Sequence, residues 1–496
     1  MSYSKSSGKP FEYASKISHR HIIADNDIQQ YIHECVIPFE GKDMELNPSL
    51  LHDIIYPTKN RIQNIIAIDG GYTTIAIKKK FPSSLISYFQ FGTLLIERKY
   101  LEGLHATPFI SPKDMAELKK LMPDKLALPT KNLLLKGQTS LKYAVRKVIY
   151  DFFMNKDRDD ESLMNTLYWF LFRKYEFSEL VNNPNDCACS FHKVGTEDYL
   201  YKCTSCNNKA YQLSRCPNCE ELEILLDEAA LDKNSYVWKC PHCGENIFLT
   251  DIFRLFETVD NELGAGGILG YILSATENLL LVHMIRILTQ IKHGFLNEFL
   301  LVKDGPLSFV GQTANMYKPM RHLLNFLRKN NNVNIIGIEK SGAFVDHAKE
   351  IADKMKPGQI FLMDNDHIYK YIMPADGNME YARTSYYGGK FIYKSKEEKL
   401  YVLTLPVETH HYYSRPQLGV GAVGVVLCLE THHYYSRPQL GDLKNIEEIL
   451  LNIDLLKCDI YQDAIIPIAL VNKLVSLSNY PGSNIIRHFT KQNISE

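Results

Sequence analysis

Cysteine is the residue type with the clearest chemistry, because eight of the chain's 11 cysteines fall within residues 183–250. They form four pairs, Cys187-x-Cys189, Cys203-x-x-Cys206, Cys216-x-x-Cys219 and Cys240-x-x-Cys243. Two thiolates separated by two residues can hold one ion from a tight turn, and two such turns complete a tetrahedral sulfur site. We therefore predict structural Zn²⁺ bound to a zinc-ribbon module.

The spacing leaves open how these pairs combine. The last two pairs are separated by 20 residues and fit a zinc ribbon, and the first two could form a second site with His192 as a substitute ligand. Other combinations, such as the second pair with the fourth, remain possible at this point. Free buried thiols would not explain three C-x-x-C pairs within 41 residues. A site with four sulfur ligands has no open position, so we expect it to support folding or docking.

Two aspartates follow apolar runs that predict buried strands. Asp69 follows residues 65–68 and precedes two glycines, and Asp304 follows residues 299–302 and precedes Gly305-Pro306. In mixed sheets, groups at strand ends converge on a cleft, where two carboxylates can share Mg²⁺ or Mn²⁺. Two such ions would activate water and stabilise the leaving oxygen in phosphodiester hydrolysis. The alternative is that each aspartate is an ordinary turn residue.

Further polar residues could join this site. Glu277 lies in a predicted helix before the Asp304 strand, where it could be a third ligand or a solvated helix glutamate. Lys340 follows the next predicted strand and could hold a phosphate as a point charge, or be an exposed turn lysine. Three reserve acids are interpreted as surface residues: Asp346, Asp364 and Asp366.

A sheet is needed to bring these residues together. The patterns predict a helix near 25–36, strands at 65–71, 73–77 and 85–96, and mostly helix in 113–182. After the cysteines they predict helices at 276–290, 318–328, 345–354 and 463–477, strands at 299–302 and 333–338, and a strand pair at 390–405. Without the cysteine segment the order is β-β-β-α-β-α-β-α, typical of an α/β, RNase H-like mixed sheet flanked by helices.

This order predicts four segments. They are an N-terminal arm (1–60), the first part of the RNase H-like domain with a helical insertion (61–182), the zinc-ribbon insertion (183–250) and the second part of the domain (251–496).

Composition excludes little. A formal net charge of -1 is unusual for a protein that coats nucleic acid, but a nuclease needs a positive charge only at its cleft. No signal peptide is recognisable, and the longest apolar run, residues 420–429, is shorter than the ~18 residues of a membrane span. We expect a soluble, cytoplasmic protein without membrane contact, whose thiols stay reduced.

A segment of 12 residues, ETHHYYSRPQLG, occurs twice without a change, at 408–419 and 430–441. Two copies do not make a structural repeat array, so we interpret them as a local duplication in a surface loop. Their histidine pairs could also bind a metal.

Three short motifs resemble those of the NurA family of nucleases. Residues 67–71 (AIDGG) resemble the first and 302–307 (VKDGPL) the second, whereas 479–482 (NYPG) followed by His488 resembles the third. The similarity extends over roughly residues 62–490, apart from the cysteine module.

The resemblance implies an RNase H-like deoxyribonuclease that prefers Mn²⁺ and acts on DNA ends and single strands, in DNA repair or antiphage defence. It also implies a homodimer docked on a HerA-type hexameric ATPase. In agreement, the chain has no G-x-x-x-x-G-K-[ST] loop with which to bind ATP itself. The family's metal ligands would fall on Asp69, Glu277, Asp304 and His488, with Tyr480 beside them.

Two rival functions remain. One is a non-catalytic zinc-ribbon scaffold that binds DNA or protein on a degenerate nuclease fold, and the other is an RNase H-like enzyme that acts on RNA. Retention of both strand-end aspartates argues against the scaffold.

Overall fold

A computed structural model describes most of the chain. It covers residues 18–35, 44–78, 83–100, 124–138, 140–155, 162–176, 187–193, 199–291, 295–330, 333–373, 380–407, 410–413, 429–432, 434–458, 464–477 and 482–493. Tyr480 and most of the first copy of the duplicated segment lie outside these residues.

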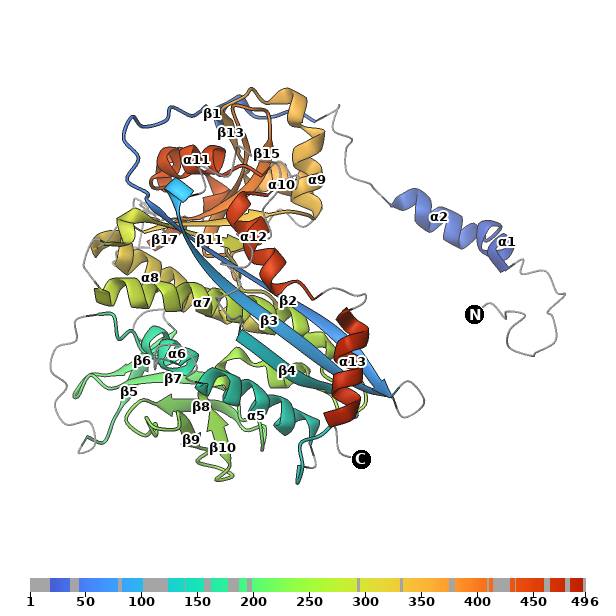
Figure 1. The fold of residues 1–496 in the computed structure, drawn as a ribbon, viewed down its shortest axis with the longest axis vertical. Helices are drawn as coiled ribbons and strands as arrows, with labels where there is room; N and C mark the ends of the chain where they lie inside the picture. Colours follow the sequence, from blue (N-terminus) through green and yellow to red (C-terminus); the bar gives the residue numbers. More distant parts are fainter. Residues whose placement is uncertain are drawn as a thin grey trace, which may run out of the picture.

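The described residues form a mixed α/β structure around one nine-stranded sheet (Figure 1). Its strands, in spatial order, are β1 (Leu51–Asp53), β13 (Gln359–Leu362), β14 (Gly388–Lys394), β15 (Leu400–Pro406), β12 (Asn334–Glu339), β11 (Phe299–Asp304), β2 (Asn64–Lys78), β3 (Ser84–Glu97) and β4 (Asp124–Lys131). β11 is parallel to both β2 and β12, and all other pairs are antiparallel.

The three strands predicted at 65–71, 73–77 and 85–96 differ from those of the structure. The two strands predicted at 65–71 and 73–77 are one continuous strand, β2, which is paired with β3 along its length. The third strand is β4, which lies in the region predicted to be mostly helical. Leu126 and Leu128 of β4 are buried, and this spacing of two residues is typical of a strand. The alternation covers too few residues to be recognised in the sequence.

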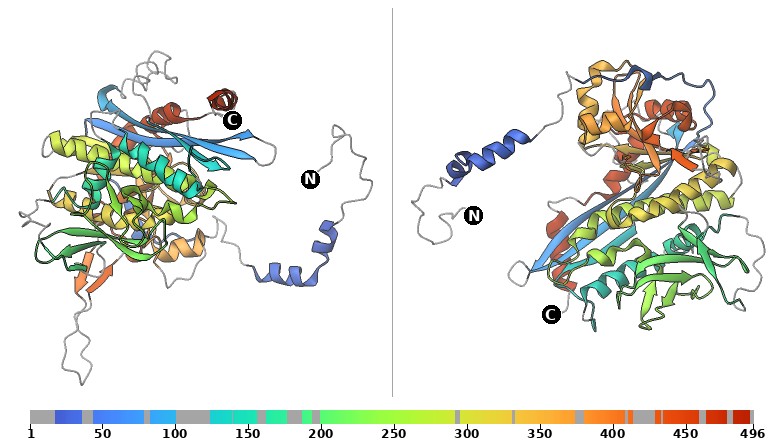
Figure 2. Two further views of the ribbon diagram at one scale, coloured as in Figure 1. Left: turned by 90° about the horizontal axis from the view of Figure 1, so that it is seen from below. Right: turned by 180° about the vertical axis from the view of Figure 1, so that it is seen from behind.

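Helices cover both faces of the sheet. α5 (Leu141–Met154), α6 (Leu163–Leu171), α7 (Leu269–Ile291) and α8 (Tyr317–Asn330) share one core with residues such as Ile66 and Ile68 of β2. α9 (Ala343–Glu350), α10 (Asn365–Tyr371), α11 (Ile446–Leu455) and α12 (Ile466–Val475) share a second core with Ile65 and Ala67. Successive residues of β2 therefore face opposite cores, which is why the strand is apolar without alternation. Figure 2 shows helices on both sides of β2 and β3.

The remaining helices lie nearer the chain ends. The predicted helix near 25–36 is confirmed as α2 (Asn26–Glu34), which follows α1 (Ser18–Ile23) and buries none of its residues. α13 (Gly482–Asn493) packs on β2 near its end. One predicted helix, 345–354, begins earlier and ends at Glu350, because the chain then forms a short 3₁₀ turn.

The cysteine segment forms two small sheets. β5 (Phe191–Lys193), β6 (Leu200–Cys203), β7 (Lys209–Arg215) and β8 (Leu222–Asp227) make a four-stranded antiparallel sheet, and β9 (Val237–Lys239) pairs with β10 (Asn246–Phe248). Residues of this cysteine module, including Leu213 and Trp238, belong to the same core as α7. The module is therefore packed into the helical layer and does not stand apart from it.

The two copies of the duplicated segment differ in backbone conformation where the structure describes both. Tyr412 and Tyr413 of the first copy lie in a strand, whereas the equivalent Tyr434 and Tyr435 lie in a 3₁₀ turn. The backbone of His410–Tyr413 (β16) pairs with that of Leu429–His432 (β17), where the second copy begins. Farther along the second copy, Tyr434 and Tyr435 are buried in the second core. The interpretation as a surface loop is therefore wrong for the second copy.

One helical stretch of the described chain, Gly266–Ile291, is long and apolar enough to cross a membrane by length and composition. Its apolar run is interrupted by Glu277 and His283, so the sequence did not indicate a span. Within the structure 72% of its most apolar part is buried, as in the core helix of a water-soluble protein.

A buried arginine joins α5 to the cysteine module. Arg146 makes a two-pronged ion pair with Asp251, at 2.8 and 2.7 Å, and both side chains are 3% exposed. It also donates to Asn218 Oδ1 and to the carbonyl of Asn246, which both belong to the module.

We expect Arg146→Met to lower the free energy of unfolding by about 3–5 kcal/mol, because it leaves the Asp251 carboxylate buried without its partner. Urea denaturation would measure the change. The neighbouring Lys147→Met removes an exposed pair with Asp151 and a contact of 5.4 Å with the Tyr150 ring, and it should change stability by less than about 1 kcal/mol. Equal effects of the two substitutions would contradict this role of Arg146.

Candidate active site and cysteine clusters

The parallel pairing of β2 and β11 places Asp69 beside Asp304. Lys303 of β11 is paired with Ile68 of β2, so the next residue on each strand is an aspartate. Asp304 is the last residue of β11, as predicted, whereas Asp69 lies within β2, at the point where its pairing with β11 ends. The predicted convergence of the two aspartates is confirmed.

The glycines after Asp69 do not form a turn, because β2 continues through them. A Cβ atom on Gly70 would lie 2.9 Å from Leu273 and 3.2 Å from the Glu277 carboxylate, both in α7. A Cβ atom on Gly71 would lie 3.1 Å from the carbonyl oxygen of Val475 in α12. The two glycines thus allow a helix to approach each face of the strand closely.

One lysine lies between the two aspartates. The Lys340 ammonium is 2.9 Å from Asp304 Oδ2 and 4.0 Å from Asp69 Oδ2. Asn472 of α12 donates a hydrogen bond of 2.9 Å to the same Asp69 oxygen. The Asp69 side chain is 2% exposed, whereas those of Asp304 and Lys340 are 23% and 27% exposed. Solvent and ligands therefore reach this cluster from the side of Asp304 and Lys340.

Burial and nearby carboxylates raise the pKa of Asp69. Burial raises its pKa most, and the carboxylates of Asp304 and Glu277 raise it further. Lys340 and the hydrogen bond from Asn472 act in the opposite direction, and the resulting pKa is about 8. A cation that bound to this carboxylate would displace the proton into solvent and lower the pKa again.

Glu277 reaches the cluster from the opposite face of the sheet, on α7. Its carboxylate lies 3.0 Å from the Lys303 ammonium, and both side chains are less than 10% exposed. Burial raises the pKa of Glu277, and Lys303 lowers it. Lys303 also donates to the carbonyl of Asp304, so it ties Glu277 to the end of β11.

A further ion pair continues the row of charges. Glu339, the last residue of β12, lies 2.8 Å from the ammonium of Lys390 in β14. The four carboxylates, at Asp69, Glu277, Asp304 and Glu339, thus face three ammonium groups, at Lys303, Lys340 and Lys390.

Sequence reasoning missed Lys303, Lys390 and Asn472. A signal was present in two cases, because Lys303 interrupts an apolar strand run and Asn472 interrupts the apolar helix 466–475. A polar residue in such a position is buried at a cost unless it meets a partner.

The structure does not bring His488 to the aspartates. His488 is exposed on α13, and Thr490, two residues farther along the helix, is hydrogen-bonded to Tyr88, which is paired with Thr73. Thr73 lies four residues beyond Asp69 along β2, roughly 13 Å away at the rise of a strand. Tyr480 is outside the described residues.

The three reserve acids are not among the groups that shift the pKa of Asp69. Asp346 and Asp366 are exposed, as predicted, and Asp364 caps α10 by accepting a hydrogen bond from the His367 amide.

Lysines hold the carboxylates of the acidic cluster in the structure. In the described part of the chain, only the two cysteine clusters place three or more possible ligand atoms within 4.8 Å of one another. The carboxylates do share a positive charge, since the ammonium of Lys340 already lies between Asp69 and Asp304. Aspartate oxygens are suitable ligands for Mg²⁺ or Mn²⁺ at this place.

The cysteines form two clusters, in the combination that the sequence favoured. Cys187, Cys189, Cys203 and Cys206 make the first, and Cys216, Cys219, Cys240 and Cys243 make the second. His192 belongs to neither and is bonded to Ser190.

The sulfur positions suit a tetrahedral ion. Sulfur–sulfur distances are 3.9 Å (Cys187–Cys203), 3.4 Å (Cys189–Cys206), 3.9 Å (Cys216–Cys243) and 3.8 Å (Cys219–Cys240). Ligands at about 2.3 Å from a tetrahedral Zn²⁺ lie about 3.8 Å apart, whereas disulfide sulfurs lie about 2.05 Å apart. Each cluster could therefore hold a zinc-type structural ion.

The three C-x-x-C pairs have the same backbone turn. The residue after the second cysteine has φ between +60° and +73° and donates its amide to the carbonyl of the first cysteine, at 2.9–3.1 Å. These residues are Asn207, Glu220 and Gly244. The repeated turn directs both sulfurs of a pair to one point, as metal binding requires.

No model of a known protein family matches the chain, and a comparison with curated proteins finds no similar sequence.

The raised pKa of Asp69 predicts a pH-dependent stability. Between about pH 4 and pH 8 the folded chain keeps a proton on Asp69, whose ordinary pKa is 3.8, and the unfolded chain releases it. The folded state then binds more protons, so stability falls as the pH rises through this window. In buffer without divalent cations, Asp69→Asn should reduce the loss of stability between pH 5 and pH 8 by about 2–4 kcal/mol.

Urea denaturation at the two pH values would measure this effect, with Asp366→Asn as the control at an exposed aspartate. An unchanged pH dependence in Asp69→Asn would show that Asp69 is ionised throughout.

The clusters predict about two zinc ions per chain. Cys203→Ser and Cys240→Ser should each lower the content to about one, because each removes a ligand from a different cluster. Plasma mass spectrometry after gel filtration would measure the metal. Cys35→Ser, at an exposed cysteine outside the clusters, is the control and should retain both ions.

Proposed function

We propose that this protein is a divalent-metal-dependent DNA nuclease of the NurA type. The observation that carries the proposal is the pairing of Asp69 and Asp304 on adjacent strands, where burial and mutual repulsion raise the pKa of Asp69 to about 8. Protein folding gains nothing from placing two carboxylates side by side, so a function that uses a cation is the simplest explanation.

The sheet supports an RNase H-like fold. Strands β2, β3 and β4 form an antiparallel meander, and β11 and β12 continue the sheet parallel to β2. Helix α7 precedes β11 and crosses the sheet beside β2, which agrees with a third acidic ligand at Glu277. The pairing of β2 with β11 places the first two motifs, at residues 67–71 and 302–307, on adjacent strands.

In the proposed enzyme, Asp69 and Asp304 would hold Mn²⁺ or Mg²⁺, with Glu277 beside them. A bound ion of this kind lowers the pKa of water and stabilises negative charge on phosphate oxygens. Lys340 lies at the exposed edge of the cluster, where its ammonium can position a DNA phosphate as a point charge. Lys303 keeps Glu277 in place, and Asn472 fixes one oxygen of Asp69.

The proposal includes further elements that rest on the resemblance alone. A homodimer that works with a HerA-type ATPase in DNA repair or antiphage defence, and a tyrosine at position 480, are parts of it. The two zinc-type ions would stabilise the cysteine module.

A non-catalytic scaffold is the second candidate, and one observation favours it. Glu277, Asp304 and Glu339 each have a lysine partner, so the charges nearly balance without a metal. In a scaffold this row of ion pairs would only join the strand ends.

A nuclease assay separates the two functions. Wild type should cleave labelled single- and double-stranded DNA when Mn²⁺ is added. Asp69→Asn and Asp304→Asn should each lower the cleavage rate at least about 100-fold. Each removes a proposed metal ligand, which costs more activity than removal of a residue that only supports a ligand. Asp366→Asn should retain the rate. Omission of Mn²⁺ is preferable to a chelator, which would also remove zinc from the cysteines.

RNA and RNA–DNA hybrids, offered in the same assay, would identify an RNA-directed enzyme. Inactivity of wild type both alone and with a HerA-type hexamer, or cleavage that survives both aspartate substitutions, would support the scaffold.

A further inference from the structure

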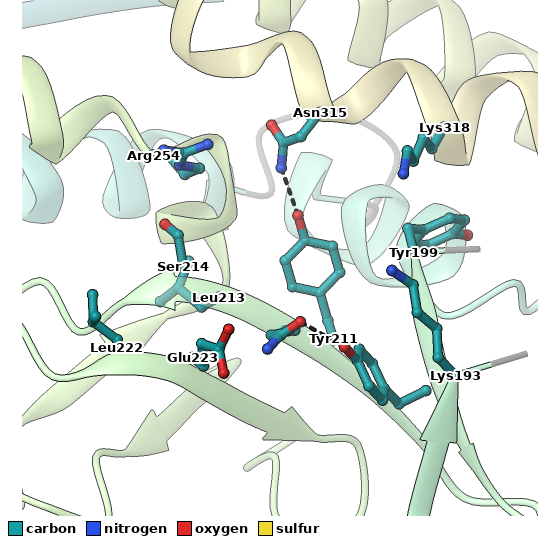
Figure 3. Close-up of a pocket in the computed structure, with 12 residues that line it drawn as sticks. Lys193, Tyr199, Tyr211, Leu213, Ser214, Leu222, Glu223, Arg254, Asn315 and Lys318 are labelled. Carbon is teal, nitrogen blue, oxygen red and sulfur yellow. Dashed lines mark hydrogen bonds between the residues drawn. The ribbon is translucent and has the colours of Figure 1, made fainter. Parts of the chain in front are cut away.

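A pocket of about 420 Å³ lies between the cysteine module and the large domain (Figure 3). One wall is the β5–β8 sheet, which contributes Lys193 and Tyr211. The opposite wall contains Arg254, Asn315 and Lys318, which lie after the module and at the start of α8. The pocket is remote in sequence from Asp69, and no residue of the acidic cluster lines it.

Aromatic and basic side chains line this pocket together. Three tyrosines, Tyr199, Tyr201 and Tyr211, and three cationic residues, Lys193, Arg254 and Lys318, contrast with one acid, Glu223. In Figure 3 the side chains of Lys193 and Lys318 extend from opposite walls toward the side of the pocket where Tyr199 lies.

Hydrogen bonds fix the tyrosine rings. The hydroxyl of Tyr211 accepts from Asn315 Nδ2 at 2.6 Å, and that of Tyr201 donates to Gln212 Oε1 at 2.6 Å. Arg173 donates to the hydroxyl of Tyr199 at 3.2 Å. A ring held in this way loses little conformational freedom when a ligand stacks on it.

Three cationic side chains line the pocket: Lys193, Arg254 and Lys318. Arg254 is paired with Glu257 through two hydrogen bonds of 2.9 and 2.7 Å, which offset its charge. Lys193 is exposed and Lys318 is half-buried, so both ammonium groups can approach a ligand without large desolvation.

We propose that this pocket binds a nucleotide unit of a single nucleic-acid strand. The base stacks against a tyrosine, and Lys193 and Lys318 bind the flanking phosphates. Aromatic rings interleaved with basic residues are the chemistry that sequence-independent binding of single strands uses. The inference rests on the proposed function in one respect, because it assigns the strand to the nuclease's own substrate.

Size favours one strand over a duplex. The volume is in the range of small-molecule sites and can enclose a base with its sugar and phosphate. A base within a duplex is stacked and paired, so it presents no free face to a tyrosine.

Binding can be tested without cleavage in the full chain carrying Asp69→Asn and Asp304→Asn. Fluorescence anisotropy would measure the Kd of labelled 12-mer oligothymidylate and oligouridylate across a series of salt concentrations. Lys193→Glu, Lys318→Glu and Tyr201→Ala should each raise the Kd about tenfold. Each lysine variant should also reduce the salt dependence by about 0.7 in the slope of log K against log salt. Oligouridylate tests whether the sugar matters.

Lys233→Glu is the matched control, because it makes the same charge change at an exposed residue of the same module, outside the pocket. If the pocket variants bind like this control, the proposal is overturned. The proposal would also be overturned, in favour of a simple anion site, if binding survives Tyr201→Ala and inorganic phosphate displaces the oligonucleotide from this variant as well as from the unsubstituted pocket.

The outcomes separate this inference from the proposed function. If the pocket variants weaken binding but wild type cleaves no substrate, the single-strand site is supported and the nuclease function is rejected. If cleavage requires Asp69 but the pocket variants bind normally, the nuclease function is supported and the single-strand site is rejected.

Discussion

The burial of Asp69 beside Asp304 is the constraint on which the arrangement of the sheet depends. A buried carboxylate next to another costs several kcal/mol unless positive charge or a proton offsets it. Lys340 supplies part of that charge directly, and Lys303 and Lys390 hold the neighbouring carboxylates Glu277 and Glu339. These lysines come from β11, from the turn after β12 and from β14, so the charges balance only when all three strands are in place.

The same residues connect the acidic cluster to the cysteine module. α7 carries Glu277 on the side of the sheet where the module's core residues pack. His283, two turns farther along α7, shares a buried hydrogen bond of 2.7 Å with Thr166 of α6. α5 is bound to the module through Arg146. Metal binding by the cysteines would therefore stabilise the helical layer against which Glu277 is positioned, although the ions themselves have no open coordination position for catalysis.

The sequence predicted those features that depend on short segments. Cysteine spacing indicated two metal clusters, and Asp69 and Asp304 after apolar runs indicated neighbouring strand ends, because parallel pairing aligns such residues. Features that depend on distant contacts were not predictable. Gly70 and Gly71 suggested a turn, but their role is to admit α7 and α12, and Asn472 meets Asp69 across 403 positions of the chain. The short strand β4 was not predicted, because its alternating apolar residues lie in a region with helical patterns and the strand is stabilised by pairing with β3.

The duplicated segment shows most directly that context decides structure. The two copies are identical in sequence, yet Tyr412 and Tyr413 of the first lie in strand β16, whereas Tyr434 and Tyr435 of the second form a 3₁₀ turn and are buried in the core. The hydroxyl of Tyr435 accepts a hydrogen bond of 3.0 Å from the backbone amide of Lys390. Lys390 in turn holds Glu339 at the end of β12, next to Lys340. The packing of the second copy thus fixes the strand that completes the row of charges, and a segment that looked dispensable in the sequence contributes to the position of the acidic cluster.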